Sequence, residues 1–115
     1  MSKPLGPYTP IIEAGEWLVC SGQLGLVDGD LLDGVEAQVT QALANMADLL
    51  DSKGAKLSDV AKTTVFLTDI DDYDEMNAAY TAAFGDHRPA RSAFAVAALP
   101  KGAKVEIEAW AMRNA

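Results

Sequence analysis

The stretch that decides the fold is residues 33–54, DGVEAQVTQALANMADLLDSKG. Its apolar residues recur at helical spacing, which is typical of an amphipathic helix with one buried face. We predict that this face consists of Val35, Val39, Ala42, Leu43, Met46, Leu49 and Leu50. Asp33 and Glu36 have the spacing of a capping box, and Gly54 stands where a helix commonly ends.

Segments with strand character flank this helix on both sides. They are rich in β-branched or aromatic residues, or alternate between apolar and polar ones, and span residues 11–12, 17–20, 60–67, 91–96 and 104–112. A second helix is predicted from about residue 72 to residue 84, with an apolar face of Tyr73, Met76, Tyr80, Ala83 and Phe84. Residues 25–34, rich in glycine and aspartate, are expected to form a loop.

These elements predict one α+β domain over residues 1–115, in the order β-β-α-β-α-β-β. Each helix has a single apolar stripe and a small domain has one core, so both helices should cover the same face of the sheet. Strands joined through a helix should be parallel, and the hairpins at the two ends antiparallel, which makes the sheet mixed. The expected architecture is a sandwich of ferredoxin-like character.

Alternation along the last two strands predicts which side chains the helices leave uncovered. Val105, Ile107, Ala109 and Ala111 should face the helices, together with Phe94 and Val96 of the preceding strand. The open face would then carry Arg91, Ala93, Ala95, Glu106, Glu108 and Trp110. Small and aromatic residues beside charged ones suggest that this face packs against another subunit. A structural ion pair at the sheet edge is the alternative that the spacing leaves open.

Charge excludes several classes of partner. The chain has 9 Lys and Arg against 17 Asp and Glu, a formal net charge of −8. Nucleic acids and anionic membranes are disfavoured, because their binding depends on clusters of Lys and Arg. A small anionic substrate stays possible, since one arginine in a pocket outweighs distant negative charges.

The sequence offers few other chemical groups. A single cysteine, Cys20, excludes an internal disulfide, and Cys20 with the single histidine, His87, cannot form an ordinary zinc site. We expect Cys20 to be an inert core thiol and His87 to lie on the surface. No signal peptide or apolar span of membrane length is present, so a cytoplasmic location is expected.

Six motifs in series resemble the reactive intermediate deaminase (Rid, or YjgF) family. They are GPY (6–8), SGQ (21–23), KTTVFL (62–67), MNAAY (76–80), PARS (89–92) and LPKGAKVEIEA (99–109). The resemblance implies a chorismate-mutase-like fold and a homotrimer whose sheets form a central barrel, with sites between subunits. It also implies hydrolysis of enamines and imines, such as 2-aminoacrylate and 2-iminopropanoate, to 2-keto acids and ammonia without a cofactor.

The resemblance also assigns roles to residues. The family's carboxylate-binding arginine falls on Arg91, whose planar guanidinium is suited to a bidentate grip. Its acidic residue falls on Glu106, which would position or deprotonate the attacking water. Positions that line the family's pocket fall on Tyr8, Ser21, Gly22 and Asn77.

One departure from the family concerns the substrate. Ala93 stands two residues after the arginine, where cysteine is frequent, and a thiol there would contact substrate. The change bears on substrate preference more than on the reaction. Two other functions remain open at this point: a non-catalytic module that binds small carboxylates in the same cleft, and a ribonuclease. The net charge of −8 counts against the ribonuclease.

Overall fold

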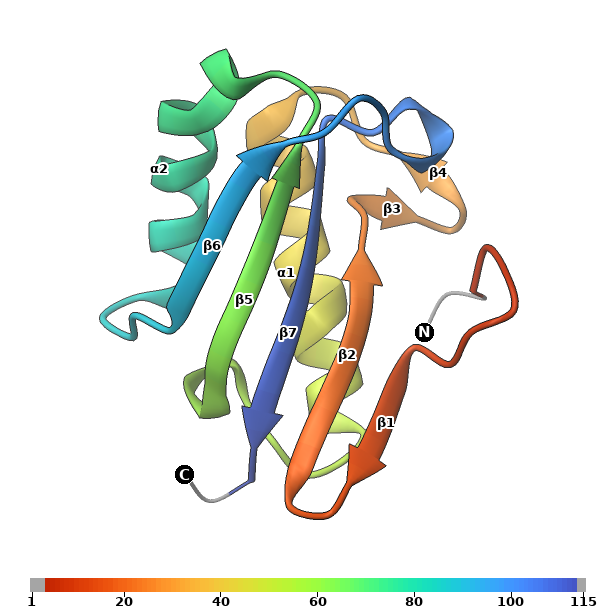
Figure 1. Cartoon of the computed structure of the whole chain (residues 1–115), viewed down its shortest axis with the longest axis vertical. Coiled ribbons are helices and arrows are strands. Elements are labelled where there is room, and N and C mark those ends of the chain that lie inside the picture. The colour runs from red at the N-terminus through yellow and green to blue at the C-terminus, as the bar shows by residue number, and fades with distance from the viewer. Residues whose placement is uncertain (1–3, 114–115) are drawn as a thin grey trace.

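A computed structural model describes residues 4–113 of the chain (Figure 1). In chain order the strands and helices are β1 (Ile11–Ala14), β2 (Trp17–Gln23), β3 (Leu26–Val27), β4 (Asp30–Leu31), α1 (Val35–Asp51), β5 (Val60–Leu67), α2 (Tyr73–Phe84), β6 (Ala90–Ala95) and β7 (Val105–Met112). A five-stranded sheet runs in the order β1-β2-β7-β5-β6, and β3 pairs only with β4. Within the sheet β5 and β6 are parallel, whereas the other pairs are antiparallel.

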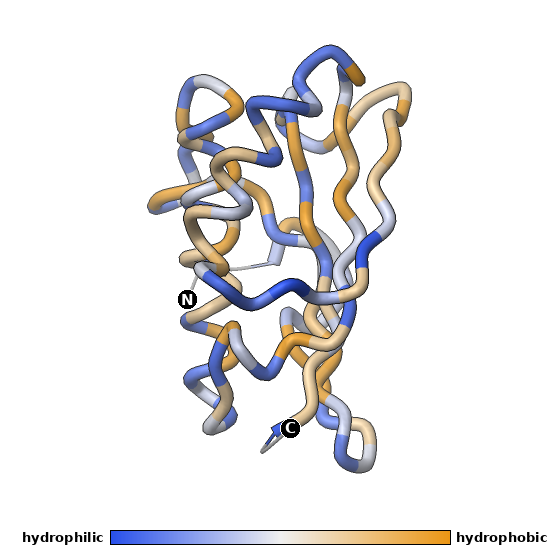
Figure 2. Tube along the Cα trace, turned by 90° about the vertical axis from the view of Figure 1, so that its left-hand side faces the viewer, coloured by the Kyte–Doolittle hydropathy of each residue, from blue (hydrophilic) through white to orange (hydrophobic). Residues whose placement is uncertain are grey.

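Both helices lie on one face of this sheet, as predicted. Figure 1 looks at the open face with α1 and α2 behind it, and Figure 2 shows the helical layer and the sheet from the side. The α+β class and the two-layer architecture are therefore confirmed.

The core forms between α1 and the middle of the sheet. All seven residues predicted for the apolar stripe of α1 are buried. Leu18, Val65 and Ile107 meet that stripe from β2, β5 and β7 and are 0% exposed. Burying a side chain of this size contributes roughly 1.5–3 kcal/mol, so this layer is the main source of stability.

The predicted capping box at the start of α1 was wrong. Gly34 is the N-cap residue, with a φ of 92°, and no side chain caps the helix from that position. The backbone N–H of Glu36 instead donates to Glu75 Oε2 of α2 at 3.2 Å. A carboxylate at a helix N-terminus is favourable, and here it comes from the neighbouring helix rather than from Asp33.

The predicted loop at residues 25–34 contains the short β3–β4 hairpin. Its tip is Asp28-Gly29, both with positive φ, which suits a tight two-residue turn. Leu24, Leu26 and Ala103 form a small apolar cluster beneath it. The prediction missed this hairpin because two-residue strands are too short to show alternation.

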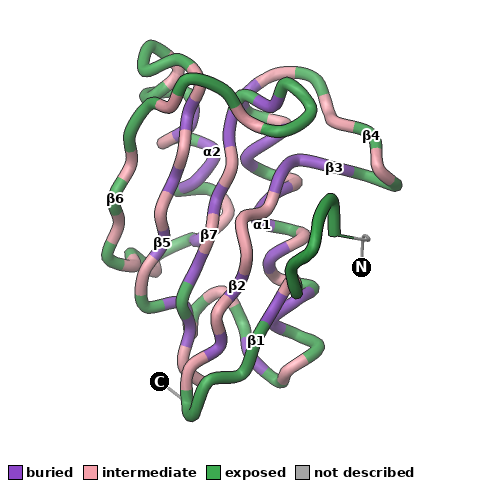
Figure 3. The backbone as a smooth tube through the Cα atoms, turned by 45° about the vertical axis from the view of Figure 1, so that its right-hand side comes forward, coloured by how far each residue is buried: buried purple, intermediate pink, exposed green. Residues whose placement is uncertain are grey.

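The predicted hairpin between the last two strands was also wrong. β7 does not pair with β6 but lies between β2 and β5, antiparallel to both. β6 therefore becomes an edge strand, and Figure 3 shows it largely exposed, like β1 at the other edge. The prediction assumed that consecutive strands pair, which is only a tendency. Pairing between distant segments leaves no sign in the local sequence pattern.

The faces of β6 are the reverse of those predicted. Phe94 is 46% exposed and packs edge-to-face on Phe66 of the open face, with ring centroids 5.4 Å apart. Ala93 instead packs against the core, and Arg91 turns towards α2. On an edge strand the largest apolar side chain does not mark the core side, because neither face is fully covered. Ala95 lies on the same face of β6 as Arg91 and Ala93, and Val96 comes after the last residue of β6.

No helix of the described residues is long and apolar enough to cross a membrane.

Candidate functional site

A cavity of about 1150 Å³ opens between the N-terminal segment, β2, the β3–β4 hairpin, α1 and β7. Four of the sequence-predicted site residues line it: Tyr8, Ser21, Gly22 and Glu106. Glu108 also lines the cavity. The sequence pattern placed it only on the same face of the last strand as Glu106. The structure therefore brings most of the predicted site together in one cavity.

An irregularity in β2 shapes one wall of the cavity. The pairing of β2 with β7 shifts register between Cys20 and Gln23, so Ser21 and Gly22 leave the regular ladder. Ser21 then bonds the N-terminal segment: its N–H donates to Pro10 O at 2.8 Å and its Oγ to Thr9 O at 2.7 Å. These bonds hold the segment that carries Tyr8 over the cavity.

Gly22 is the residue that leaves room for the Glu106 side chain. A Cβ built on Gly22 would lie 2.1 Å from Glu106 Oε2 and 2.7 Å from its Cδ. Real Cβ atoms are not found at such distances, so no other residue fits here without displacing the carboxylate. Gly22 therefore leaves open the space that the Glu106 carboxylate occupies.

The Glu106 carboxyl is set up to hold a proton more readily than an ordinary glutamate. Burial raises its pKa, and the negative charge of Glu108 on the same face raises it further. A carboxylate with a raised pKa in a cavity is a candidate general base or acid.

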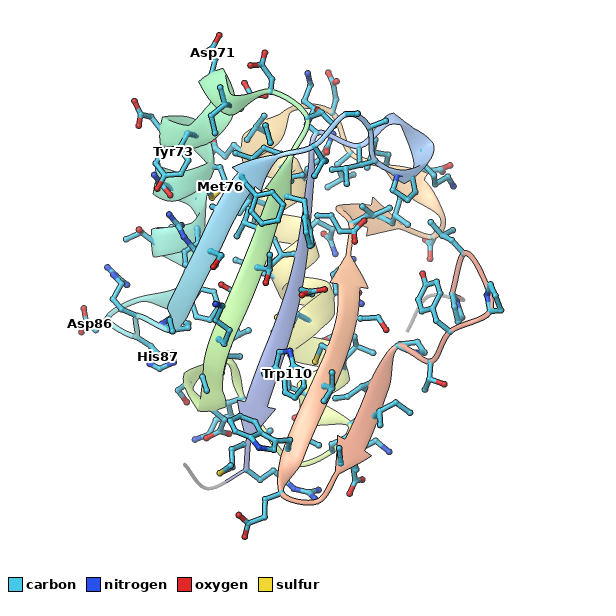
Figure 4. All side chains as sticks on the ribbon, in the orientation of Figure 1. Asp71, Tyr73, Met76, Asp86, His87 and Trp110 are labelled. Atoms are coloured by element: carbon cyan, nitrogen blue, oxygen red, sulfur yellow. The ribbon has the colours of Figure 1, made fainter. Side chains whose placement is uncertain are left out.

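Arg91 lies elsewhere, against α2 at the β6 edge. Its Nη2 donates to Tyr73 Oη at 3.1 Å, and its Nη1 points to Met76 Sδ at 3.8 Å. The guanidinium carbon is 4.9 Å from the ring centroid of Tyr80, which is a cation–π contact. Figure 4 shows Tyr73 and Met76 on α2 beside β6.

Arg91 and Glu106 lie on opposite faces of the sheet. Arg91 is paired in register with Thr63, which is 0% exposed on the helix side. Glu106 is paired with Phe66, whose side chain is on the open face next to Phe94. The predicted sharing of one face by these two residues was therefore wrong, and they cannot contact one substrate within a single chain.

Asn77 and Ala93 lie with Arg91 rather than with Glu106. Asn77 is on α2, one residue after Met76, and its buried Oδ1 has no hydrogen-bond partner among the described residues. Ala93 is two residues along β6 from Arg91 and is packed partly against the core. The predicted site thus divides into a Glu106 half, with Tyr8, Ser21 and Gly22, and an Arg91 half, with Asn77 and Ala93.

Cys20 and His87 belong to neither half. Cys20 is buried, and burial raises the pKa of its thiol to about 11, which fits the predicted inert core thiol. His87 was expected at the surface but is part-buried, with Nε2 2.7 Å from Val60 O. It ties the loop before β6 to the start of β5.

Sequence reasoning missed the contacts of Arg91 with α2. Tyr73, Met76 and Tyr80 were predicted only as the apolar face of a helix. Their spacing does place all three near one side of α2. Nothing in the local pattern of β6, however, indicated that Arg91 faces that side. Tyr73 is 38% exposed, and its part in the site is contact with the guanidinium rather than core packing.

Comparison with known proteins agrees with the motifs. The profile of the family described as Endoribonuclease L-PSP matches residues 1–113. The 2-iminobutanoate/2-iminopropanoate deaminase of Salmonella typhimurium is 40% identical over 115 residues, which cover 96% of this chain and 90% of that one. The human protein of the same name is 41% identical over 113 residues, covering 96% and 82%.

A solved structure gives the same result for the fold. The Escherichia coli YjgF gene product superposes with a TM-score of 0.91 at 40% identity, covering 96% of this chain and 91% of that one. This similarity extends over almost the whole chain, in sequence and in structure together. The chain therefore belongs to the family described as Endoribonuclease L-PSP, which is the reactive intermediate deaminase (YjgF) family that its motifs resemble.

Proposed function

We propose that this protein is a 2-iminobutanoate/2-iminopropanoate deaminase, which hydrolyses reactive enamines and imines to 2-keto acids and ammonia. The observation that carries the proposal is the identity of about 40% over nearly the whole chain to proteins of that name. Arg91 and the cavity-lining Glu106, to which the family resemblance assigns carboxylate binding and water positioning, support the proposal.

Arg91 binds the substrate carboxylate. A guanidinium stays charged at any working pH and offers paired N–H donors to both carboxylate oxygens. Arg91 is half-buried, where a charge interacts more strongly than in water. Holding the carboxylate keeps the neighbouring imine carbon beside the attacking water in the substrate and in the transition state alike.

Glu106 positions the attacking water and moves its proton. The water oxygen bonds to the imine carbon, one proton passes to Glu106, and the C=N π electrons become a lone pair on nitrogen. Glu106 returns its proton to the nitrogen, and the proton of the new hydroxyl group follows. The C–N bond then breaks to release ammonia, and the hydroxyl oxygen becomes the keto oxygen. Water is the only co-reactant, so the proposal needs no cofactor and no metal.

The complete site forms between two copies of the chain. Arg91 and Glu106 are on opposite faces of the sheet, so a single substrate reaches both only if they come from different subunits. The open face carries the exposed apolar side chains of Ile12 (47%), Phe94 (46%) and Trp110 (44%), which favours burial against a partner. We assign this interface to a homotrimer, in line with the family resemblance, and the protein to the cytoplasm.

The remaining site residues line the substrate pocket in this proposal. Tyr8, Ser21 and Gly22 surround the reacting centre near Glu106, and Asn77 and Ala93 complete the wall beside Arg91. The Oδ1 of Asn77, which has no partner within residues 4–113, supports this role, because a buried acceptor is costly unless a ligand or another subunit satisfies it. Ala93 makes the pocket wider and less polar than a cysteine would.

The pH dependence of the reaction should report the environment of Glu106. Because the base must be deprotonated, kcat/KM is expected to fall as pH drops through the raised pKa of Glu106. The acid limb should therefore lie above the ordinary glutamate value of about 4.3. Glu108→Gln removes the repulsive charge and should move that limb to lower pH. An acid limb that stays in place in Glu108→Gln would contradict this cause of the shift.

Gly22→Ala is expected to lower kcat at least about tenfold, because the new methyl group displaces the Glu106 carboxylate from its place beside the reacting carbon. The backbone of Gly22 has no positive φ, so the fold should survive. Steady-state kinetics with circular dichroism as the control measures both effects. Normal turnover in this variant would show that the position of Glu106 does not matter.

The proposal is tested by supplying the imine directly. An amino-acid oxidase generates 2-iminopropanoate from alanine, and semicarbazide traps the imine that survives; the protein should lower the trapped fraction. A module that only binds small carboxylates would leave the trapped fraction unchanged but bind 2-keto acids saturably. The net charge of −8 opposes the ribonuclease activity in the family's description, and strong salt-sensitive RNA binding would revive it.

A further inference from the structure

The guanidinium of Arg91 is held between α2 and the sheet edge by contacts of different kinds. Tyr80 provides a ring face 4.9 Å from the guanidinium carbon, and Tyr73 a second ring at 5.6 Å. Tyr73 Oη also accepts a hydrogen bond from Nη2 at 3.1 Å. Met76 Sδ, at 3.8 Å from Nη1, is only a weak acceptor.

The Tyr80 ring is a rigid platform. It is 4% exposed, and its hydroxyl lies 2.6 Å from Thr63 Oγ1 in a buried hydrogen bond. Thr63 is also the register partner of Arg91 on the neighbouring strand. Stacking on a fixed ring limits how far the guanidinium tilts, but leaves it free to rotate within its own plane.

The Tyr73 hydroxyl removes that remaining freedom. We infer that Tyr73 is a positioning residue, whose hydrogen bond to Nη2 sets the in-plane orientation of the Arg91 guanidinium and so presents its free N–H groups to the substrate carboxylate. This inference rests on the proposed function of Arg91. A guanidinium already fixed loses less conformational freedom when the carboxylate binds, which strengthens binding.

The kinetic consequence is specific. The carboxylate keeps the same charge in the imine, in the tetrahedral intermediate and in the keto acid, so the grip of Arg91 stabilises ground state and transition state alike. Loss of such uniform binding raises KM and leaves kcat nearly unchanged. Tyr73 does not touch the reacting carbon in this arrangement, so its removal should change KM alone.

The test is Tyr73→Phe, which keeps the ring and removes only the hydroxyl. We expect KM for 2-iminopropanoate to rise about fivefold, the equivalent of one ordinary hydrogen bond, with kcat within about twofold of the original. The inhibition constant of pyruvate, which presents the same carboxylate, should rise by the same factor. Tyr73 is 38% exposed, so the melting temperature should hardly change. Ile70→Ala, at a 52% exposed residue just before α2, is the control and leaves hydroxyl and guanidinium in place.

The outcomes separate this inference from the function on which it rests. Suppose that Tyr73→Phe leaves KM and the inhibition constant of pyruvate unchanged while Arg91→Ala is inactive. This result would overturn the role of Tyr73 but leave the proposed deaminase function standing. An equal rise of KM in Ile70→Ala would overturn it too, because the effect would then be structural. Full activity in Arg91→Ala would overturn the proposed function itself, and this inference with it.

Discussion

Arg91→Ala is expected to lower kcat/KM for 2-iminopropanoate by roughly 10²- to 10³-fold, because the substrate carboxylate loses the half-buried guanidinium that we propose binds it. The fold should survive, since Arg91 is on an edge strand and makes no salt bridge among the described residues. Truncation leaves the rings of Tyr73 and Tyr80 without their cation, which affects local packing only.

Arg91→Lys is the matched control for this prediction. Lysine keeps the positive charge but cannot form two parallel hydrogen bonds to a carboxylate. Its activity should therefore lie between that of the original protein and that of Arg91→Ala, with the loss mainly in KM. The trapping assay measures all three proteins under the same conditions. Activity in Arg91→Ala equal to that of the unaltered protein would refute the role of Arg91.

Glu106→Gln is expected to lower kcat by roughly 10²- to 10⁴-fold, the usual contribution of a positioned general base. KM should change little, because the amide fills the same space and Arg91 still holds the carboxylate. The two variants thus differ in kind: Arg91→Ala loses substrate binding, whereas Glu106→Gln loses the chemical step.

Stability provides a second readout for Glu106→Gln. The raised pKa of Glu106 means that its environment disfavours the charged form. A neutral side chain of the same size should fold at least as well at neutral pH, and the melting temperature should stay equal or rise. A drop in kcat with a large loss of melting temperature would instead point to a structural role for this carboxyl.

Local pattern predicted the elements that have one covered face. The helical spacing of apolar residues gave α1 with its buried stripe, and strict alternation gave β7 with Val105 and Ile107 in the core. Both elements lie in the middle of the domain, where one buried face produces a clear periodicity of apolar residues in the sequence. Glu106 was placed on the open face of β7 for the same reason.

The predictions that were wrong concern features that depend on contacts between distant segments of the chain. β7 lies between β2 and β5 because of pairing across the whole chain, which the order of elements does not reveal. The direction of Arg91 is decided by the tyrosines of α2 rather than by the alternation of its own strand. The cavity around Glu106 depends on the N-terminal segment and on the register shift in β2. Only the family resemblance indicated beforehand that Tyr8, Ser21 and Gly22 belong to the site.

Because Arg91 and Glu106 lie on opposite faces of the sheet, we propose that one active site takes its two halves from different subunits. Mixing the inactive variants Arg91→Ala and Glu106→Gln, by unfolding them together and refolding, tests it directly. Some interfaces then combine an intact Arg91 from one chain with an intact Glu106 from the other. Random mixing of equal amounts should restore about a quarter of the original sites, and so of the activity.

Two controls accompany the mixture: each variant refolded alone, which should stay inactive, and the two variants mixed without unfolding. If each site is shared between subunits, the refolded mixture should hydrolyse the imine at about a quarter of the original level. A refolded mixture that forms mixed oligomers but stays as inactive as its components would contradict it, because both residues would then act from the same chain.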